Sequence, residues 1–240
     1  MINWYMALCT LCAFFVKGMC GFANTLVFSS MLSFKVNNVD ISPVDLMLGY
    51  PANALMVWRE RKSLETRIWL PLSVLVILGC IPGAMALKNL DAGLLKVIFG
   101  AVIVLLGIEM LTRVLMRKKQ HAPKWMIYVI GPMAGVMCGL FSIGALLAAY
   151  IGRTAEDAHA FRGNLSMVFF TENTFRLILY IVTGILTVES LLTTLTLIPF
   201  MLAGLFIGMR LSGKLSDKAV MCGVATLLII SGVSLVISNL

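Results

Sequence analysis

The chain has 240 residues, of which 60% are hydrophobic and 12% charged, and its mean hydropathy is +0.98. These values lie far outside the range of an ordinary soluble domain and indicate a polytopic membrane protein. The net charge of +8 does not indicate nucleic-acid binding, because the sequence offers no basic face outside the loops between apolar segments.

A membrane-spanning helix needs about 20 mostly apolar residues. Apolar segments of this kind follow one another at about 1–34, 42–58, 68–87, 92–112, 125–151, 164–184, 187–209 and 219–239. The connections between these eight segments are too short for a soluble domain, and the N-terminus lacks the pattern of a cleaved signal. We therefore expect an all-α membrane protein.

A related pattern interrupts the first and the fifth segments, as Gly18–Gly21 (Gly-Met-Cys-Gly) and Val136–Gly139 (Val-Met-Cys-Gly). Irregular backbone is tolerated at membrane depth only where it is buried in protein or lines a cavity. One helix over residues 1–34, at about 1.5 Å per residue, would be roughly 50 Å long, against a bilayer core of about 30 Å. Each interrupted segment is therefore predicted to enter and leave on the same side.

The second segment has a legible start. Ser42 reads as an N-cap, Pro43 as a first-turn proline and Asp45 as an acidic residue near the helix N-terminus. The sequence therefore predicts that this helix begins at Ser42.

The two halves, residues 1–120 and 121–240, match in order. Asn53–Val57 matches Asn164–Val168. Four more positions, Gly79, Gly83, Leu90 and Gly107, match Gly204, Gly208, Leu215 and Gly232. If every segment crosses the membrane the halves are parallel, and if the first segment of each half re-enters they are inverted.

The basic residues distinguish these arrangements. Eight crossings would divide the loop Lys and Arg residues nine to seven. In the inverted arrangement only Lys35 and Lys88 remain in the opposite loops. The other side then collects Arg59, Arg61, Lys62, Arg67, Arg113, Arg117, Lys118, Lys119, Lys124, Arg153, Arg162, Arg210, Lys214 and Lys218. The positive-inside rule thus favours two inverted repeats, each a broken re-entrant segment plus three spanning helices, with Met1 and Leu240 outside.

Re-entrant hairpins have a chemical consequence, because the second half-helix starts near the membrane midplane and its free N–H groups and positive dipole bind anions. Two inverted hairpins would bring two such ends together, around Phe22–Leu26 and Leu140–Gly144. The expected substrate-binding residues are Gly21, Phe22, Asn24, Thr25, Asn53, Gly139, Ser142, Gly144, Asn164 and Arg176. Alternatively, the small residues only permit close helix packing and the asparagines tie helices together.

Charged residues inside the apolar segments are few. Glu172 and Arg176 lie one helical turn apart and either form a local ion pair, or Arg176 neutralises the substrate while Glu172 carries a coupling proton. Lys17, beside the first break, either attracts the anion or extends outward. Glu172 and Lys17 are therefore the coupling candidates.

A second hypothesis is a transmembrane thiol electron carrier similar to the DsbD/CcdA group. Cys20 and Cys138 occupy matching positions, and Cys9 and Cys12 form a C-x-x-C pair. Neither Cys20 nor Cys138 has the adjacent proline typical of that group. No enzyme is expected, since His121 and His159 lie outside the apolar segments, and no cofactor or metal is expected.

The glycine patterns resemble the TauE/SafE family of sulfite exporters and sulfonate permeases over nearly the whole chain. The similar stretches are Gly18–Phe22, Gly135–Gly144 leading into Tyr150, Ala160–Arg162, and Ile198 and Pro199 followed by Gly204, Gly208, Gly213 and Leu215. Where many relatives have Gly-Gly-Pro, this chain has Gly144–Leu146 after Ile143.

This resemblance implies a multi-pass secondary transporter of the bacterial cytoplasmic membrane that moves sulfite, a sulfonate or another organosulfur anion. The implied partners are that anion, membrane lipids and a coupled proton or ion, and a homo-oligomer is compatible with this interpretation. Neither import nor export follows from the resemblance.

Overall fold

A computed structural model describes residues 4–32, 38–89, 91–116, 124–142, 144–212 and 217–239. The regular elements in these ranges are all helical. Ten are α-helices: α1 (Trp4–Cys20), α2 (Asn24–Leu32), α3 (Asn38–Arg59), α4 (Thr66–Asn89), α5 (Ala92–Met116), α6 (Ile127–Phe141), α7 (Ala145–Thr154), α8 (Ala158–Val182), α9 (Val188–Leu211) and α10 (Asp217–Asn239). Two are short 3-10 helices, η1 (Arg61–Ser63) and η2 (Lys124–Met126).

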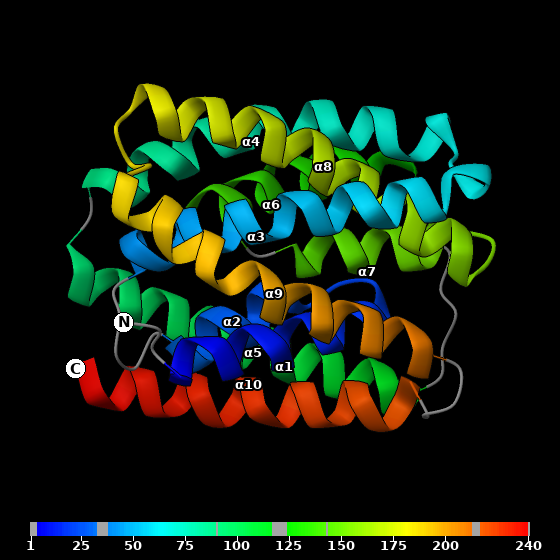
Figure 1. The fold of residues 1–240 in the computed structure, drawn as a ribbon. Helices are drawn as coiled ribbons and strands as arrows, with labels where there is room; N and C mark the ends of the chain where they lie inside the picture. The colour runs from blue at the N-terminus through cyan, green and yellow to red at the C-terminus, as the bar shows by residue number, and fades with distance from the viewer. Residues whose placement is uncertain are drawn as a thin grey trace.

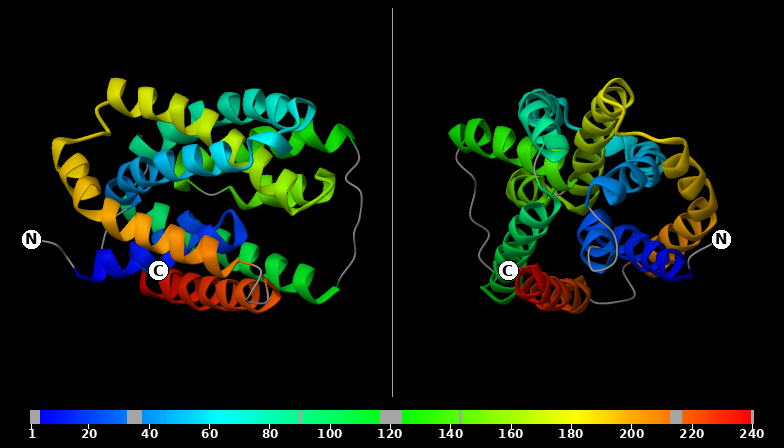
Figure 2. Two further views of the ribbon diagram at one scale, coloured as in Figure 1. Left: turned by 45° about the vertical axis from the view of Figure 1, so that its right-hand side comes forward. Right: turned by 90° about the vertical axis from the view of Figure 1, so that its left-hand side faces the viewer.

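The helices lie roughly along one common direction, and both chain ends are at the same end of the bundle (Figure 1). The predicted first segment is two helices, α1 and α2, which pack against each other, and the predicted fifth segment is likewise α6 and α7. Helices from the two halves of the sequence pair extensively: α1 with α9, α4 with α6, α3 with α8 and α5 with α10. Figure 2 shows the same bundle from two further sides.

Polarity is distributed as expected for a protein with lipid around it. Large apolar side chains such as Val182, Ile237 and Leu105 are exposed at 78%, 71% and 67% on the outside, whereas charged groups such as Arg176 are buried. Within the described residues, α8, α9 and the part of α4 from Thr66 to Ala86 are long and apolar enough to cross a membrane. Shorter apolar stretches lie in α1, α5, α6 and α10.

Glycines allow the helices of the two halves to approach closely. A Cβ atom on Gly79 or Gly83 of α4 would meet the backbone carbonyl of Pro132 or Val136 in α6. In the same way, a Cβ atom on Gly204 of α9 would meet the carbonyl of Leu11 in α1. Small residues let transmembrane helices pack backbone against backbone, so these positions hold the broken segments against the opposite half.

The predicted start of the second segment is wrong. Helix α3 begins at Asn38, so that Ser42, Pro43 and Asp45 lie inside the helix. Pro43 has no backbone N–H, so one carbonyl of the preceding turn lacks its intrahelical donor, a loss that helices in membrane proteins tolerate. As a result Asp45 is a buried side chain inside the protein rather than a group at an exposed helix end.

Candidate functional site

A small internal cavity lies between the two helix breaks. Its volume is about 30 Å³, and one water needs about 10–15 Å³. The cavity therefore has room for a few heavy atoms. Its lining is Lys17, Phe22, Ala23, Asn24, Thr25, Leu26, Asp45, Gly49, Asn53, Ser142, Gly144, Ala145, Phe169, Glu172, Asn173 and Arg176.

The backbone at both breaks departs from helical geometry. In the first break Gly21 has φ +84° and Ala23 has φ +72°, a conformation that residues with a side chain rarely adopt. In the second break Ser142 has φ +59° and ends α6 in the left-handed conformation. The starts of α2 and α7 consequently both line the cavity, and the N–H groups of a first helical turn lack partners within the helix.

Lys17 lies in the last turn of α1, and its side chain is fully buried. Its Nζ donates to Oδ1 of Asn24 at 3.1 Å and to Oδ1 of Asn53 at 2.7 Å. Both acceptors are neutral amides, although an ammonium group has three donors and prefers a charged partner when buried. Lys17 is thus a cation at the cavity wall whose hydrogen-bonded partners are uncharged.

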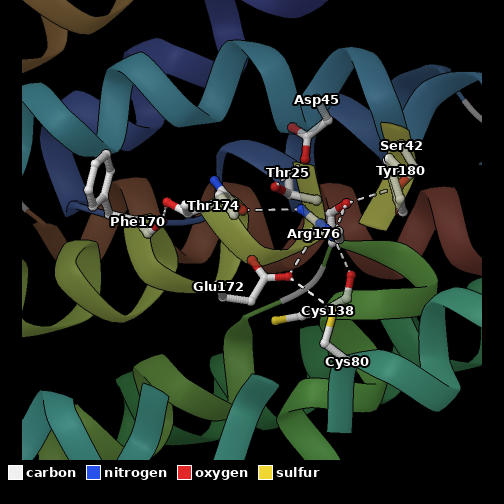
Figure 3. Close-up of polar contacts among 12 residues, drawn as sticks. Thr25, Ser42, Asp45, Cys80, Cys138, Phe170, Glu172, Thr174, Arg176 and Tyr180 are labelled. Carbon is white, nitrogen blue, oxygen red and sulfur yellow. Dashed lines mark hydrogen bonds and ion pairs between the residues drawn. The ribbon is translucent and has the colours of Figure 1, made fainter. Parts of the chain in front are cut away.

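Asp45 projects from α3 into the same cavity and was not predicted as a site residue. Its Oδ2 accepts from the Thr25 hydroxyl at 2.7 Å, and its Oδ1 accepts from Asn24 Nδ2 at 3.5 Å. The carboxylate is 2% exposed. Figure 3 shows Asp45 and Thr25 lying close together, with Arg176 below them.

Arg176 joins α8 to the break between α6 and α7, where Ser142 lies (Figure 3). Its Nη1 donates to the carbonyl of Cys138 and, at 2.8 Å, to Oγ of Ser142, while Nη2 donates to Oδ1 of Asn173 at 3.2 Å. Its Nε lies 3.3 Å from Oε1 of Glu172, but it finds no hydrogen-bond acceptor among the described residues. The ion pair expected from the spacing of Glu172 and Arg176 is therefore present, and the guanidinium retains donor capacity.

Two further contacts hold the breaks between α1 and α2 and between α6 and α7 in place. Ser142 lies 3.2 Å from the hydroxyl of Ser42, which in turn lies 2.8 Å from the Tyr180 hydroxyl. At the first break, Phe22 packs edge to face on Phe161 with ring centroids 6.0 Å apart. Both breaks thus contact α8, which contributes Phe161, Arg176 and Tyr180.

The structure brings most of the predicted site residues together and separates three of them. The cavity lining includes Phe22, Asn24, Thr25, Asn53, Ser142, Gly144 and Arg176 together with Lys17 and Glu172. Gly21 instead packs against the Arg162 side chain, and Gly139 packs against the Cys80 carbonyl. Asn164 accepts from the backbone N–H of Glu65 at 2.8 Å and donates to the Ala160 carbonyl at 2.9 Å, so this asparagine holds α8 against the segment that precedes α4.

Seven lining residues were not predicted: Ala23, Leu26, Asp45, Gly49, Ala145, Phe169 and Asn173. Asp45 did carry a signal, since an ionisable residue inside an apolar segment is a functional candidate by default, but the apparent N-cap at Ser42 placed it at a helix end. No comparable signal marks Phe169 or Gly49, because aromatic residues and glycines are common in the apolar segments.

All six cysteines lie within the described residues, and none of them is in a disulfide. Cys138 is buried beside the Arg176 contact, and Cys80 donates to Oε1 of Glu172 at 3.6 Å. The thiol-carrier hypothesis gains no support from this arrangement. Of the two histidines, His159 lies in the first turn of α8 with Nδ1 2.7 Å from Oε2 of Glu60, and His121 lies outside the described residues.

Comparison with known proteins gives one family. The family model described as sulfite exporter TauE/SafE matches residues 6–235. No curated protein and no solved structure gives a significant match. The matched range includes both helix breaks and every residue that lines the cavity, and it confirms the resemblance seen in the glycine patterns. The chain therefore belongs to the TauE/SafE sulfite exporter family.

Proposed function

We propose that this protein is a multi-pass secondary transporter of the bacterial cytoplasmic membrane that moves a small organosulfur anion, of the sulfite and sulfonate class. The observation that carries the proposal is the cavity between the two helix breaks, which two cations, Lys17 and Arg176, both line. Two helix starts line the same cavity, and helix N-termini bind anions. The family is a transporter family, and anion transport is the function that this lining supports best.

Movement of the two halves around the site would give access from either side, and it would widen the cavity, which has room for only a few heavy atoms in this conformation, to admit a larger sulfonate. The cross-half helix pairs support two structurally equivalent halves, because exchanging the halves maps the pair of α1 with α9 onto that of α6 with α4. That these halves are inverted is proposed from the loop charges. Both the inverted and the eight-crossing arrangement place the chain ends on one side, as they are in Figure 1. In transporters of this kind the substrate lies near the midplane between broken helices.

Charge balance suggests how the anion is coupled to a proton. Lys17 and Arg176 are offset in the cavity by Asp45 and Glu172, so that an added anion leaves an uncompensated charge. Glu172 forms an ion pair with Arg176, with its Oε1 3.3 Å from the Arg176 Nε. Protonation of Glu172 would release the guanidinium to the substrate, and the anion and the proton would then cross together.

Uptake of radiolabelled sulfite into proteoliposomes tests the proposal. The Arg176→Gln variant removes a charged donor, and hydrogen bonds to charged groups contribute about 1.5–3 kcal/mol, so kcat/KM for sulfite should fall by roughly tenfold or more. Arg210→Gln, an exposed arginine in the last turn of α9, is the matched control and should transport like the wild type. A panel with an alkanesulfonate and a carboxylate defines the substrate class.

Arg176→Gln alone leaves Glu172 buried without its cation, which could prevent folding. A second variant controls for this effect. The double variant Glu172→Gln with Arg176→Gln restores charge balance and should fold yet remain slow. Glu172→Gln alone should retain sulfite exchange and lose the response of net uptake to an imposed pH gradient. Wild-type kcat/KM in the double variant would contradict the proposed site.

A further inference from the structure

Asp45 is the unexpected element in a site proposed to bind anions. A carboxylate at the wall of an anion cavity repels a ligand oxygen that carries only negative charge. It attracts a ligand group that donates a hydrogen bond. The acidic wall therefore bears on which anions the cavity takes.

The hydrogen bonds of Asp45 leave part of its capacity unused. An ionised carboxylate offers about four acceptor positions. Thr25 and Asn24 occupy two of them, the second at the long distance of 3.5 Å. Both donors are neutral, and the carboxylate lines the cavity. Acceptor positions that a ligand donor can satisfy are thus present beside the cavity.

Glu172, the other carboxylate in the lining, forms an ion pair with the Arg176 guanidinium at 3.3 Å, whereas the hydrogen-bond donors to Asp45 are both neutral. Donors from Lys17 and Arg176 remain for the charged end of a ligand, since Lys17 makes two hydrogen bonds with three donors and Arg176 Nε has no acceptor among the described residues. In Figure 3 Asp45 reaches toward Arg176 from the opposite helix. The cavity thus has donors and a separate acceptor within one small space.

We propose that Asp45 is a specificity-determining residue, and that the cavity selects small monoanions carrying their own O–H or N–H donor over anions of the same shape without one. This inference rests on the proposed function of the cavity. The sulfonate or sulfite group lies with Lys17 and Arg176, and the donor group of the same molecule donates to the Asp45 carboxylate. A site built to hydrogen-bond a hydroxyl rejects the analogue that lacks it, because the buried acceptor is left unpaired.

Two stable sulfonates of nearly equal size test this. 2-Hydroxyethanesulfonate and propane-1-sulfonate differ only by a hydroxyl in place of a methyl group. In proteoliposomes containing the wild-type protein, kcat/KM should be about tenfold or more higher for the hydroxylated compound, as expected for one hydrogen bond to a charged group. Because this ratio is measured on the wild type, its result does not depend on the folding of a variant.

The variants then locate the effect. Asp45→Asn keeps the size of the side chain and removes its charge, and the ratio should fall below about threefold. Asp157→Asn makes the same change at the N-cap of α8, where the side chain accepts from the backbone N–H of Ala160; asparagine caps equally well, so the wild-type ratio should persist.

Equal transport of both sulfonates by the wild type, or an unchanged ratio in Asp45→Asn, would overturn the role of Asp45 while leaving anion transport intact. Absence of transport for sulfite and for both sulfonates would instead contradict the proposed function itself.

Discussion

Residues at matching positions of the two halves do not always make matching side-chain contacts. Asn53 and Asn164 occupy matching positions, yet only Asn53 lines the cavity. The first half has Lys17 two residues before its Met-Cys-Gly pattern, and the second half has Gly135 there. Asn53 therefore meets an ammonium group, whereas Asn164 bonds to backbone atoms of Glu65 and Ala160. The repeat predicted that the two asparagines occupy matching positions, but it did not predict their hydrogen-bond partners.

These two asparagines should respond differently to the same substitution. Asn164→Ala leaves the backbone N–H of Glu65 without its acceptor, which costs about 1–3 kcal/mol, so the melting temperature should fall while KM for the transported anion stays unchanged. Asn53→Ala should raise that KM several-fold, because the Lys17 ammonium loses an acceptor and its position. Thermal unfolding in detergent and uptake kinetics measure the two effects. A raised KM in Asn164→Ala with normal stability would contradict this assignment.

At the scale of elements, the apolar segments and the two breaks were predictable because apolar runs and paired glycines leave a direct trace in the sequence. The described helices lie within or near the predicted segments. Helix boundaries were harder to predict. The Ser42 to Asp45 pattern resembles a capped start, but α3 begins about one turn earlier, at Asn38. Which helices pair across the halves could not be predicted, because a glycine shows that close packing is possible without showing its partner.

The glycine contacts predict a matched pair of stability effects. Gly79→Ala should lower the melting temperature clearly, since the new Cβ atom would overlap the Pro132 carbonyl of α6. Gly223→Ala in α10 has nothing within 4 Å of the added atom and should be neutral or slightly stabilising, because alanine favours a helix by about 1 kcal/mol over glycine. Thermal unfolding of both variants decides this, and equal destabilisation would contradict the packing described.

For the whole molecule, the sequence predicted an all-helical membrane protein of this family. The family is confirmed, and the regular elements of the described residues are all helical. The inverted orientation of the halves, the outer position of both chain ends and the division at residue 120 remain predictions. They depend on the charge of loops, several of which fall outside the described residues. Cavity chemistry could be predicted only in part, since burial of four charged groups at one place depends on the packing of five helices.

The central claim is that the transported anion occupies the cavity between the breaks. Protection from alkylation tests it most directly, in a transport-competent chain whose six native cysteines are replaced by alanine and which carries Ser142→Cys. A saturating concentration of 2-hydroxyethanesulfonate should slow modification by N-ethylmaleimide at least about threefold, because ligand and reagent compete for the same small space. Ser63→Cys, in η1 and away from the cavity lining, is the control and should react at an unchanged rate. Unaltered modification at position 142 under conditions where the anion is taken up would contradict the account.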